Sequence, residues 1–407
     1  MGVREDVKPQ GNIHLLMVMQ ALAGAVGPIM ISLAGLVGLQ LALDPALATL
    51  PVAGYNIGVA VAMLPVAWLL ARLGRRVTYL LGALLCSGAG LLAAAAIVGE
   101  QFWLFAAAAA VAGFYTACAQ NYRFAAADLA APGQQPRAIS KVMLGGLAAA
   151  VIGPQLVIYS QAALPGAPYA GSFVALAGLA LLAVPVIARL QVPPAAATDS
   201  AAPGRPLLAI VRTPVFLVGA LCGVCSYGLM AFVMTAAPLA MVGHGHAVND
   251  ATLGIQWHVL AMFVPSFFSG RWIERYGKVP ITGLGLLLLA AAGLAALSGL
   301  QVVHFWGSLV LLGLGWNLSF VGATAIIAGS YRPAERAKVQ AANDFLVFAT
   351  VAVASLSAGY LLAENSWQQL NQIILPVVAA VVLVLVSCRR AVAASAGESL
   401  RTVVGED

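Results

Sequence analysis

Two pairs of side chains, each spaced four residues apart, could together bind a soft metal ion. Met230 and Met234 form one pair, and His258 and Met262 form the other. On a helix, a spacing of four places both side chains on one face, roughly 6 Å apart along the axis. Thioethers with an imidazole and no carboxylate nearby suit monovalent copper. Methionine is also a common packing residue, but a histidine deep in a membrane is costly and usually functional. We therefore expect a metal site here.

The composition places these pairs on membrane-spanning helices. The chain has 407 residues, of which 62% are hydrophobic and 8% charged, and its mean hydropathy is +0.96. Apolar runs near the ~20 residues needed to cross a bilayer recur along the whole length. We expect an all-α membrane protein with twelve transmembrane helices, near residues 13–39, 51–70, 77–98, 102–126, 138–159, 170–190, 214–241, 252–273, 279–300, 305–328, 338–362 and 370–386.

The basic residues predict the orientation in the membrane. All 20 Lys and Arg fall in alternate loops or at adjoining helix ends, whereas the other loops carry only acidic charges, at Asp44, Glu100, Asp250 and Glu364. By the positive-inside rule the basic side faces the cytoplasm, and so do both termini. The net charge of +6 then reflects topology, and no nucleic acid partner is expected. The five cysteines lie in or beside the helices, so we expect no disulfide framework.

The chain divides into two predicted six-helix halves. Residues 1–190 form the N-terminal half, 191–213 a cytoplasmic linker, and 214–407 the C-terminal half with a cytoplasmic tail. A loop sequence repeats at an offset of 203, so that 67–75 aligns with 270–278. It resembles the Gly-x-x-x-Asp-Arg-x-Gly-Arg-Arg signature of the major facilitator superfamily, although the first copy lacks the leading glycine and the acid. The resemblance implies the fold of that superfamily, whose members hold substrate near mid-membrane between two rocking halves.

Met-x-x-x-Met on the seventh helix and His-x-x-x-Met on the eighth resemble the CcoA-type copper importers of that superfamily. The resemblance implies that Met230, Met234, His258 and Met262 bind copper, which is the transported substrate. It also implies a multi-pass protein of the bacterial inner membrane that is not an enzyme, needs no cofactor and supports assembly of the cbb-type cytochrome oxidase. Its partners would be copper, the lipid bilayer and a cytoplasmic copper chaperone.

Four further residues are candidate accessory copper contacts. Cys222 and Cys225 precede the Met pair on the cytoplasmic side, where thiols could receive the ion, although small core residues would look the same. His244 and His246 lie in the predicted outer loop and either gather copper or are simply solvated. An inner gate is expected from charged residues near the cytoplasmic helix ends, at Arg72, Asp128, Glu274 and Asp344. Asp128 and Asp344 would pair there with Arg72, Arg75 or Arg76.

Two other functions fit the same sequence. The first is a facilitator-type carrier or exporter of a small organic compound, with Met and His acting as packing. Its path could be lined by amides and aromatic rings, namely Tyr55, Asn56, Gln120, Asn121, Trp316 and Asn317. The second is a membrane copper sensor or chaperone that binds copper without net transport. A nucleotide-driven pump is not supported, because the phosphate-binding Gly-x-x-x-x-Gly-Lys-Ser/Thr loop does not occur.

Overall fold

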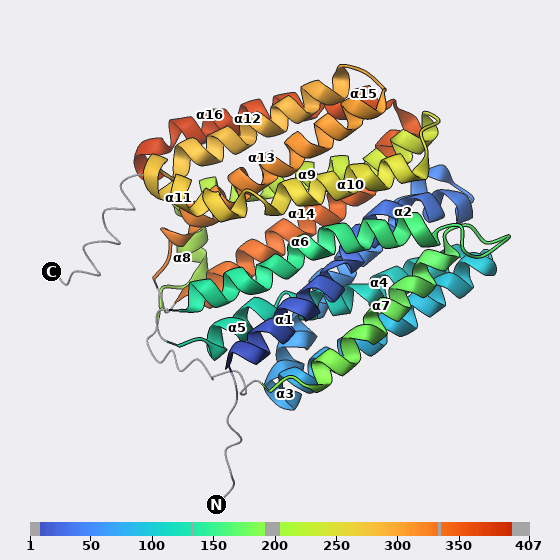
Figure 1. Ribbon diagram of the computed structural model, residues 1–407. Coiled ribbons are helices and arrows are strands. Elements are labelled where there is room, and N and C mark those ends of the chain that lie inside the picture. The colour runs from blue at the N-terminus through green and yellow to red at the C-terminus, as the bar shows by residue number, and fades with distance from the viewer. Residues whose placement is uncertain (1–8, 132–133, 192–203, 333–334, 393–407) are drawn as a thin grey trace, which may run out of the picture. The chain divides into compact units, whose positions relative to one another are not determined.

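The computed structural model describes residues 9–131, 134–191, 204–332 and 335–392, and all regular structure in these ranges is helical (Figure 1). Most of the predicted linker at 191–213 lies outside the described residues. So does the end of the predicted tail after residue 392, together with Arg4, Lys8 and Arg401 near the termini.

The chain forms two compact units. The first contains Met1–Ala197 and Gly245–Gln256, and the second contains Thr198–His244 and Trp257–Asp407. Helices of the first unit are α1 Pro9–Gly24, α2 Val26–Leu41, the short 3-10 helix η1 Pro45–Leu47, α3 Leu50–Val98, α4 Phe102–Ala119, α5 Tyr122–Leu129, α6 Gln135–Ser160 and α7 Ala170–Ala188. Helices of the second unit are α8 Leu207–Val211, α9 Pro214–Gly243, α11 Ser266–Tyr276, α12 Lys278–Leu297, α13 Val302–Ala328, α14 Arg336–Glu364, α15 Trp367–Gln372 and α16 Ile374–Ser387.

The remaining helix, α10 (Val248–Phe263), contributes to both units. Its first part joins the first unit through amide side chains. Gln155 Nε2 on α6 donates to Gln256 Oε1 at 2.8 Å, and Gln161 Nε2 donates to Asn249 Oδ1.

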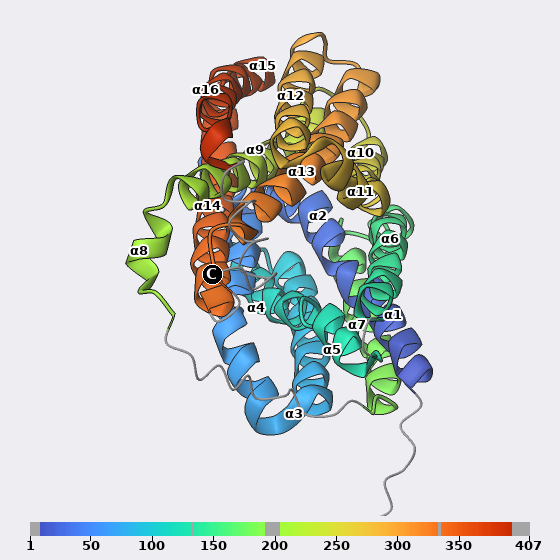
Figure 2. The same ribbon diagram turned by 90° about the vertical axis from the view of Figure 1, so that its left-hand side faces the viewer.

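Helix α3 contains two membrane crossings. A straight helix of its 49 residues would be about 74 Å long, whereas α4, with 18 residues, is about 27 Å long. Yet the parts of α3 before and after Gly74 both pack on α4: a Cβ on Gly58 would lie 2.0 Å from the Ala110 carbonyl oxygen, and one on Gly82 would lie 2.9 Å from Cys118 Sγ. The chain therefore turns back within α3, at Gly74 (φ 77°), as Figure 2 shows.

The same turn recurs in the second unit. Gly277, with φ 91°, separates α11 from α12 and lies 203 residues after Gly74. A Cβ would meet nothing within 4 Å at Gly74 and only Pro280 Cδ, at 3.7 Å, at Gly277. Glycine is therefore required by its positive φ, which a side chain would strain, and not by lack of space. The repeated loop signature thus specifies a repeated backbone turn.

The helices account for the twelve predicted crossings. Within the described residues, ten helical stretches are long and apolar enough to cross a membrane, and the bent pair α10–α11, with 41° at its break, adds an eleventh. One of the ten stretches, Pro45–Val98, holds two crossings because it turns at Gly74. The prediction of an all-α membrane protein with this architecture is confirmed.

Candidate functional site

The predicted copper ligand His258 connects two helices. Its side chain is fully buried on α10, and its Nδ1 lies 2.8 Å from the Leu309 carbonyl oxygen on α13. A carbonyl can only accept, so Nδ1 carries the proton and donates, which leaves Nε2 as an acceptor. Among the described residues, Nε2 is buried without a hydrogen-bond partner. A Cβ on Gly313 would lie 2.4 Å from the His258 carbonyl oxygen, so the two helices are in close contact at this turn.

The three methionines of the predicted copper site differ in exposure. Met230 is 2% exposed, Met262 is 8% exposed, and Met234 is half-buried. Met262 also lies against α13, because Asn317 Nδ2 donates to its carbonyl oxygen at 2.7 Å. These environments are those of packed apolar side chains, and the ligand role of the four residues stays a prediction.

The four accessory residues lie along α9 and in the loop that follows it. Cys222 is fully buried and Cys225 is 7% exposed, and Ser226 Oγ donates to the Cys222 carbonyl oxygen. His244 is exposed and ends α9, with its backbone N–H and its Nδ1 both directed at the Ala240 carbonyl oxygen. His246 is half-buried in the following loop. Within the described residues, no three His, Cys, Asp or Glu side chains are grouped as a metal site.

An aromatic cluster lies on three helices of the second unit. It consists of Tyr227 on α9, Trp316 and Phe320 on α13, and Phe348 on α14. The Tyr227 ring meets Trp316 and Phe320 edge to face, each at 5.2 Å between ring centroids, and lies 6.1 Å from Phe348. Trp316 and Phe320 stack on each other at 5.2 Å and 11°. All four side chains are half-buried, so each keeps an accessible part.

Buried apolar residues pack against this aromatic cluster. Ala231, Val347 and Val351 form a buried layer against which Tyr227 and Phe320 pack. Within the described residues, Trp316 Nε1 is buried without a hydrogen-bond partner. Tyr227, Trp316, Phe320 and Phe348 all stand near the middle of their long helices, and so near the middle of the predicted crossings. Sequence analysis named Trp316 but missed Phe320 and Phe348, although the four-residue spacing of Trp316 and Phe320 predicts a shared helix face.

Two polar residues that sequence analysis named as a lining, Tyr55 and Asn121, hydrogen-bond within the first unit. Tyr55 and Thr116 join α3 to α4 through a hydrogen bond of 2.9 Å between their hydroxyls. Asn121 bonds locally, donating to the Ala117 carbonyl oxygen at 3.2 Å. Tyr55 also approaches α2, where a Cβ on Gly27 would lie 3.4 Å from its hydroxyl. Tyr55 is only 4% exposed, so its hydroxyl joins helices within the first unit.

Of the predicted gate residues, Asp128 has a defined ion-pair partner. Arg75 Nη2 donates to Asp128 Oδ2, joining the turn within α3 to α5. Arg75 is 6% exposed and Asp128 is 49% exposed. Arg72 instead lies over the Trp68 ring at 5.9 Å, and Glu274 is exposed on α11. Asp344, on α14, accepts from Asn343 Nδ2 at 3.5 Å. The gating role of these residues stays a prediction.

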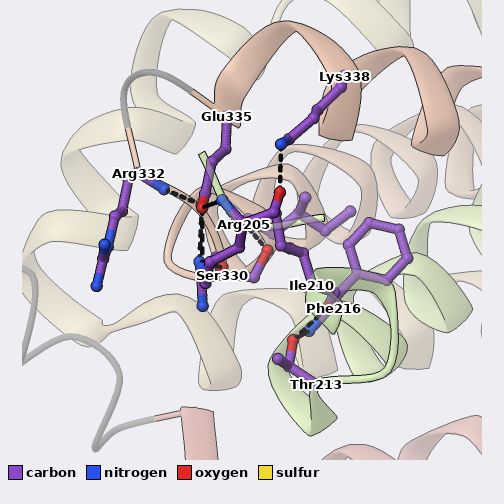
Figure 3. A network of polar contacts seen from close by, with 9 residues as sticks. Arg205, Ile210, Thr213, Phe216, Ser330, Arg332, Glu335 and Lys338 are labelled. Atoms are coloured by element: carbon purple, nitrogen blue, oxygen red, sulfur yellow. Dashed lines mark hydrogen bonds and ion pairs between the residues drawn. The ribbon is translucent and has the colours of Figure 1, made fainter. Parts of the chain in front are cut away.

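A polar network that sequence analysis missed anchors the segment before α8 (Figure 3). The Glu335 carboxylate accepts from Arg205 N, Nε and Nη2 at 2.7–2.9 Å and from Arg332 N at 2.9 Å. Arg205 Nη2 also donates to the Ser330 carbonyl oxygen at 2.9 Å, and Lys338 Nζ donates to the Arg205 carbonyl oxygen. The Arg205 hydrogen bonds lower the pKa of Glu335 to about 2, and the same pair raises the pKa of Arg205.

Ile210 of α8 extends this attachment into an apolar contact. It packs with Phe216 and Ala220 of α9, with Ile327 of α13 and with Val339 of α14. The polar network and the apolar contacts of Ile210 together hold the ends of α9, α13 and α14. These are the three helices that carry the aromatic cluster.

Comparison with known proteins identifies a family and several relatives. The model of the Major Facilitator Superfamily matches residues 15–255 and 219–401. The riboflavin transporter RfnT of Brucella anthropi is 52% identical over 380 residues, which cover 92% of this chain and 95% of that protein. YdeG, an MFS-type transporter of Bacillus subtilis, is 32% identical over 380 residues, covering 89% and 88%.

Two solved structures share the fold at low sequence identity. The human organic anion transporter MFSD10 gives a TM-score of 0.63 at 15% identity and covers 93% of this chain and 100% of that chain. The nucleoside transporter NupG gives a TM-score of 0.66 at 11% identity and covers 92% and 98%.

The prediction of a CcoA-type copper importer is wrong. A relative that shares half of its residues with nearly the whole chain is a riboflavin transporter, which fits the alternative prediction of a carrier for a small organic compound. Copper as substrate, a copper chaperone as partner and a role in cytochrome oxidase assembly lose their support with it. The physical reason the motifs misled is that a four-residue spacing suits helix packing as well as metal ligation, and Met230 and Met262 are buried among the apolar core residues.

Proposed function

Because the chain belongs to the major facilitator superfamily and is similar to a riboflavin transporter over nearly its whole length, we propose that it carries riboflavin across the bacterial inner membrane. The similarity to that transporter is the observation that carries the proposal. Transport changes no covalent bond of the solute, so the protein acts without catalysis and without a cofactor.

The chemistry of riboflavin fits the residues of the helix interiors. Riboflavin is uncharged and combines a flat three-ring heterocycle with a flexible chain of hydroxyl groups. The ring needs aromatic surface, which Tyr227, Trp316, Phe320 and Phe348 offer in the second unit. The hydroxyl chain needs neutral hydrogen-bonding groups. Neither the ring nor the hydroxyl chain requires a charged group within the membrane.

The distribution of basic residues supports an orientation with both termini in the cytoplasm. All Lys and Arg stand at alternate ends of the predicted crossings, and the acidic outer loops carry none. His244 and His246 would then face the periplasm. A Cys introduced at Gly245 should react with an impermeant thiol reagent in cells whose outer membrane is permeable, and labelling from the cytoplasmic side alone would invert this orientation.

The proposed function is tested in cells that neither synthesise nor import riboflavin. Cells that produce this protein should accumulate labelled riboflavin and grow at low external riboflavin, whereas cells with an empty vector should do neither. A copper chelator should leave the accumulation unchanged. Protein that is present in the membrane without any flux of riboflavin in either direction would refute the proposal.

A further inference from the structure

We propose that the aromatic cluster of Tyr227, Trp316, Phe320 and Phe348 is the binding site for the flat ring of the solute, and that Trp316 selects for hydrogen-bond acceptors on the ring edge. This inference rests on the proposed function and adds the residues that recognise the ring. It assigns binding to one face of the second unit, formed by α9, α13 and α14.

The geometry of the four rings suits a stacked ligand. Trp316 and Phe320 are nearly parallel, at 11°, so an added flat ring can continue the same offset stack. Tyr227 meets both rings edge to face, at 90° and 84°, and fixes their orientation from the side. The buried layer of Ala231, Val347 and Val351 supports the cluster, so the rings need little ordering when a ligand arrives.

Exposure distinguishes this cluster from the fully buried aromatic contacts. Phe105 and Phe173 meet edge to face at 5.1 Å, but both are fully buried and offer no face to a ligand. Trp367 likewise has a buried Nε1 without a partner among the described residues, but its side chain is 1% exposed. Trp316 alone of these residues combines a half-buried ring with a buried, unsatisfied N–H.

The Trp316 N–H gives the site a preference among flat ligands. A buried donor without an acceptor is unfavourable, and a ligand that supplies the acceptor relieves this cost. The isoalloxazine ring carries two carbonyl oxygens and unprotonated ring nitrogens on its edge. The Trp316 N–H is inaccessible to solvent in this conformation. A carrier that alternates between two states can expose this N–H in its other state. An aromatic hydrocarbon of the same size would stack but would leave the N–H unpaired.

Two variants with a matched control test the assignment by titrating purified protein with riboflavin and following the quenching of flavin fluorescence. Phe320→Leu removes stacking surface and should raise Kd roughly tenfold, and Trp316→Phe keeps a ring but removes the donor and should raise it three- to tenfold. Trp103→Phe is the control, since Trp103 is 68% exposed and also meets a neighbouring ring, Phe102, edge to face. Its Kd should equal that of the wild type.

The outcomes separate this inference from the proposed function. Wild-type protein that neither binds nor transports riboflavin overturns the function. Wild-type binding together with unchanged Kd values in Phe320→Leu and Trp316→Phe overturns the site. Lumiflavin, which has the isoalloxazine ring without the hydroxyl chain, should show the same losses, because the ring makes the contact. Should the variants fail to fold, irradiating wild-type protein with bound riboflavin should oxidise Trp316 in preference to Trp103, and the reverse preference refutes the site.

Discussion

Replacing Glu335 with Gln should release α8 from the rest of the second unit, while the second unit itself stays folded. The carboxylate accepts four hydrogen bonds, three from Arg205 and one from the backbone of Arg332. Gln keeps a single oxygen acceptor and turns its amide donors toward the remaining N–H groups, so about half of these bonds are lost. The side chain of Glu335 is inaccessible to solvent, whereas that of Arg205 is 39% exposed.

The expected size of the effect follows from the pKa of Glu335. A fall from 4.5 to about 2 corresponds to an upper limit of about 3.4 kcal/mol of stabilisation. Solvent around the partly exposed Arg205 screens part of the interaction, which leaves about 2 kcal/mol. The local opening constant of α8 should therefore rise about 30-fold in Glu335→Gln. Hydrogen exchange of the Leu207–Val211 amides measures this constant directly.

The control and the pH dependence make this prediction specific. Arg332→Ala keeps the backbone donor and removes only an exposed side chain, so α8 should exchange as in the wild type. Because the folded pKa of Glu335 is depressed, its stabilisation is fully present above pH 4.5 and is lost as the pH falls toward 2. Protection of α8 should follow that course in the wild type and be insensitive to pH in Glu335→Gln. An increase below twofold in Glu335→Gln, or an equal increase in Arg332→Ala, would refute the reasoning.

Three further predictions concern the ligand motif, the gate and the packing of the first unit. Met234→Leu removes a thioether at nearly constant volume and should change neither riboflavin uptake nor cellular copper content; a fall in copper content alone would restore the copper assignment. Asp128→Asn breaks the ion pair with Arg75 and should slow riboflavin transport in vesicles while leaving its Kd unchanged, whereas a changed Kd would place Asp128 in the binding site. Gly58→Ala should lower thermal stability in detergent strongly, because its Cβ would lie 2.0 Å from the Ala110 carbonyl oxygen, whereas Gly88→Ala, with nothing within 4 Å, should be neutral or stabilising; equal effects of the two would refute the packing of α3 on α4.

Much of the fold could be predicted because a bilayer leaves few choices. Each crossing must satisfy its backbone internally, so long apolar runs become helices, and their number follows from hydropathy. The turns at Gly74 and Gly277 could be predicted from the repeated loop signature, since a positive φ selects glycine at both positions. The break between α10 and α11 could also be predicted, because Pro265 lies in it and cannot donate a helix hydrogen bond.

The candidate site was harder to predict because its chemistry is carried by common residues. The Met230–Met234 and His258–Met262 spacings are those of one helix face, which copper coordination and ordinary packing share. The hydrogen bond from His258 to the Leu309 carbonyl oxygen joins residues 51 apart, a contact that spacing does not encode. The pairing of Arg205 with Glu335, 130 residues apart, escaped prediction for the same reason.

The flux of riboflavin through purified protein in vesicles tests the central claim most directly. Vesicles with the wild-type protein should equilibrate labelled riboflavin far faster than empty vesicles, and Phe320→Leu should need a higher riboflavin concentration for half-maximal flux. The same vesicles should take up no monovalent copper above the rate of empty vesicles. Copper uptake without any flux of riboflavin would contradict the account.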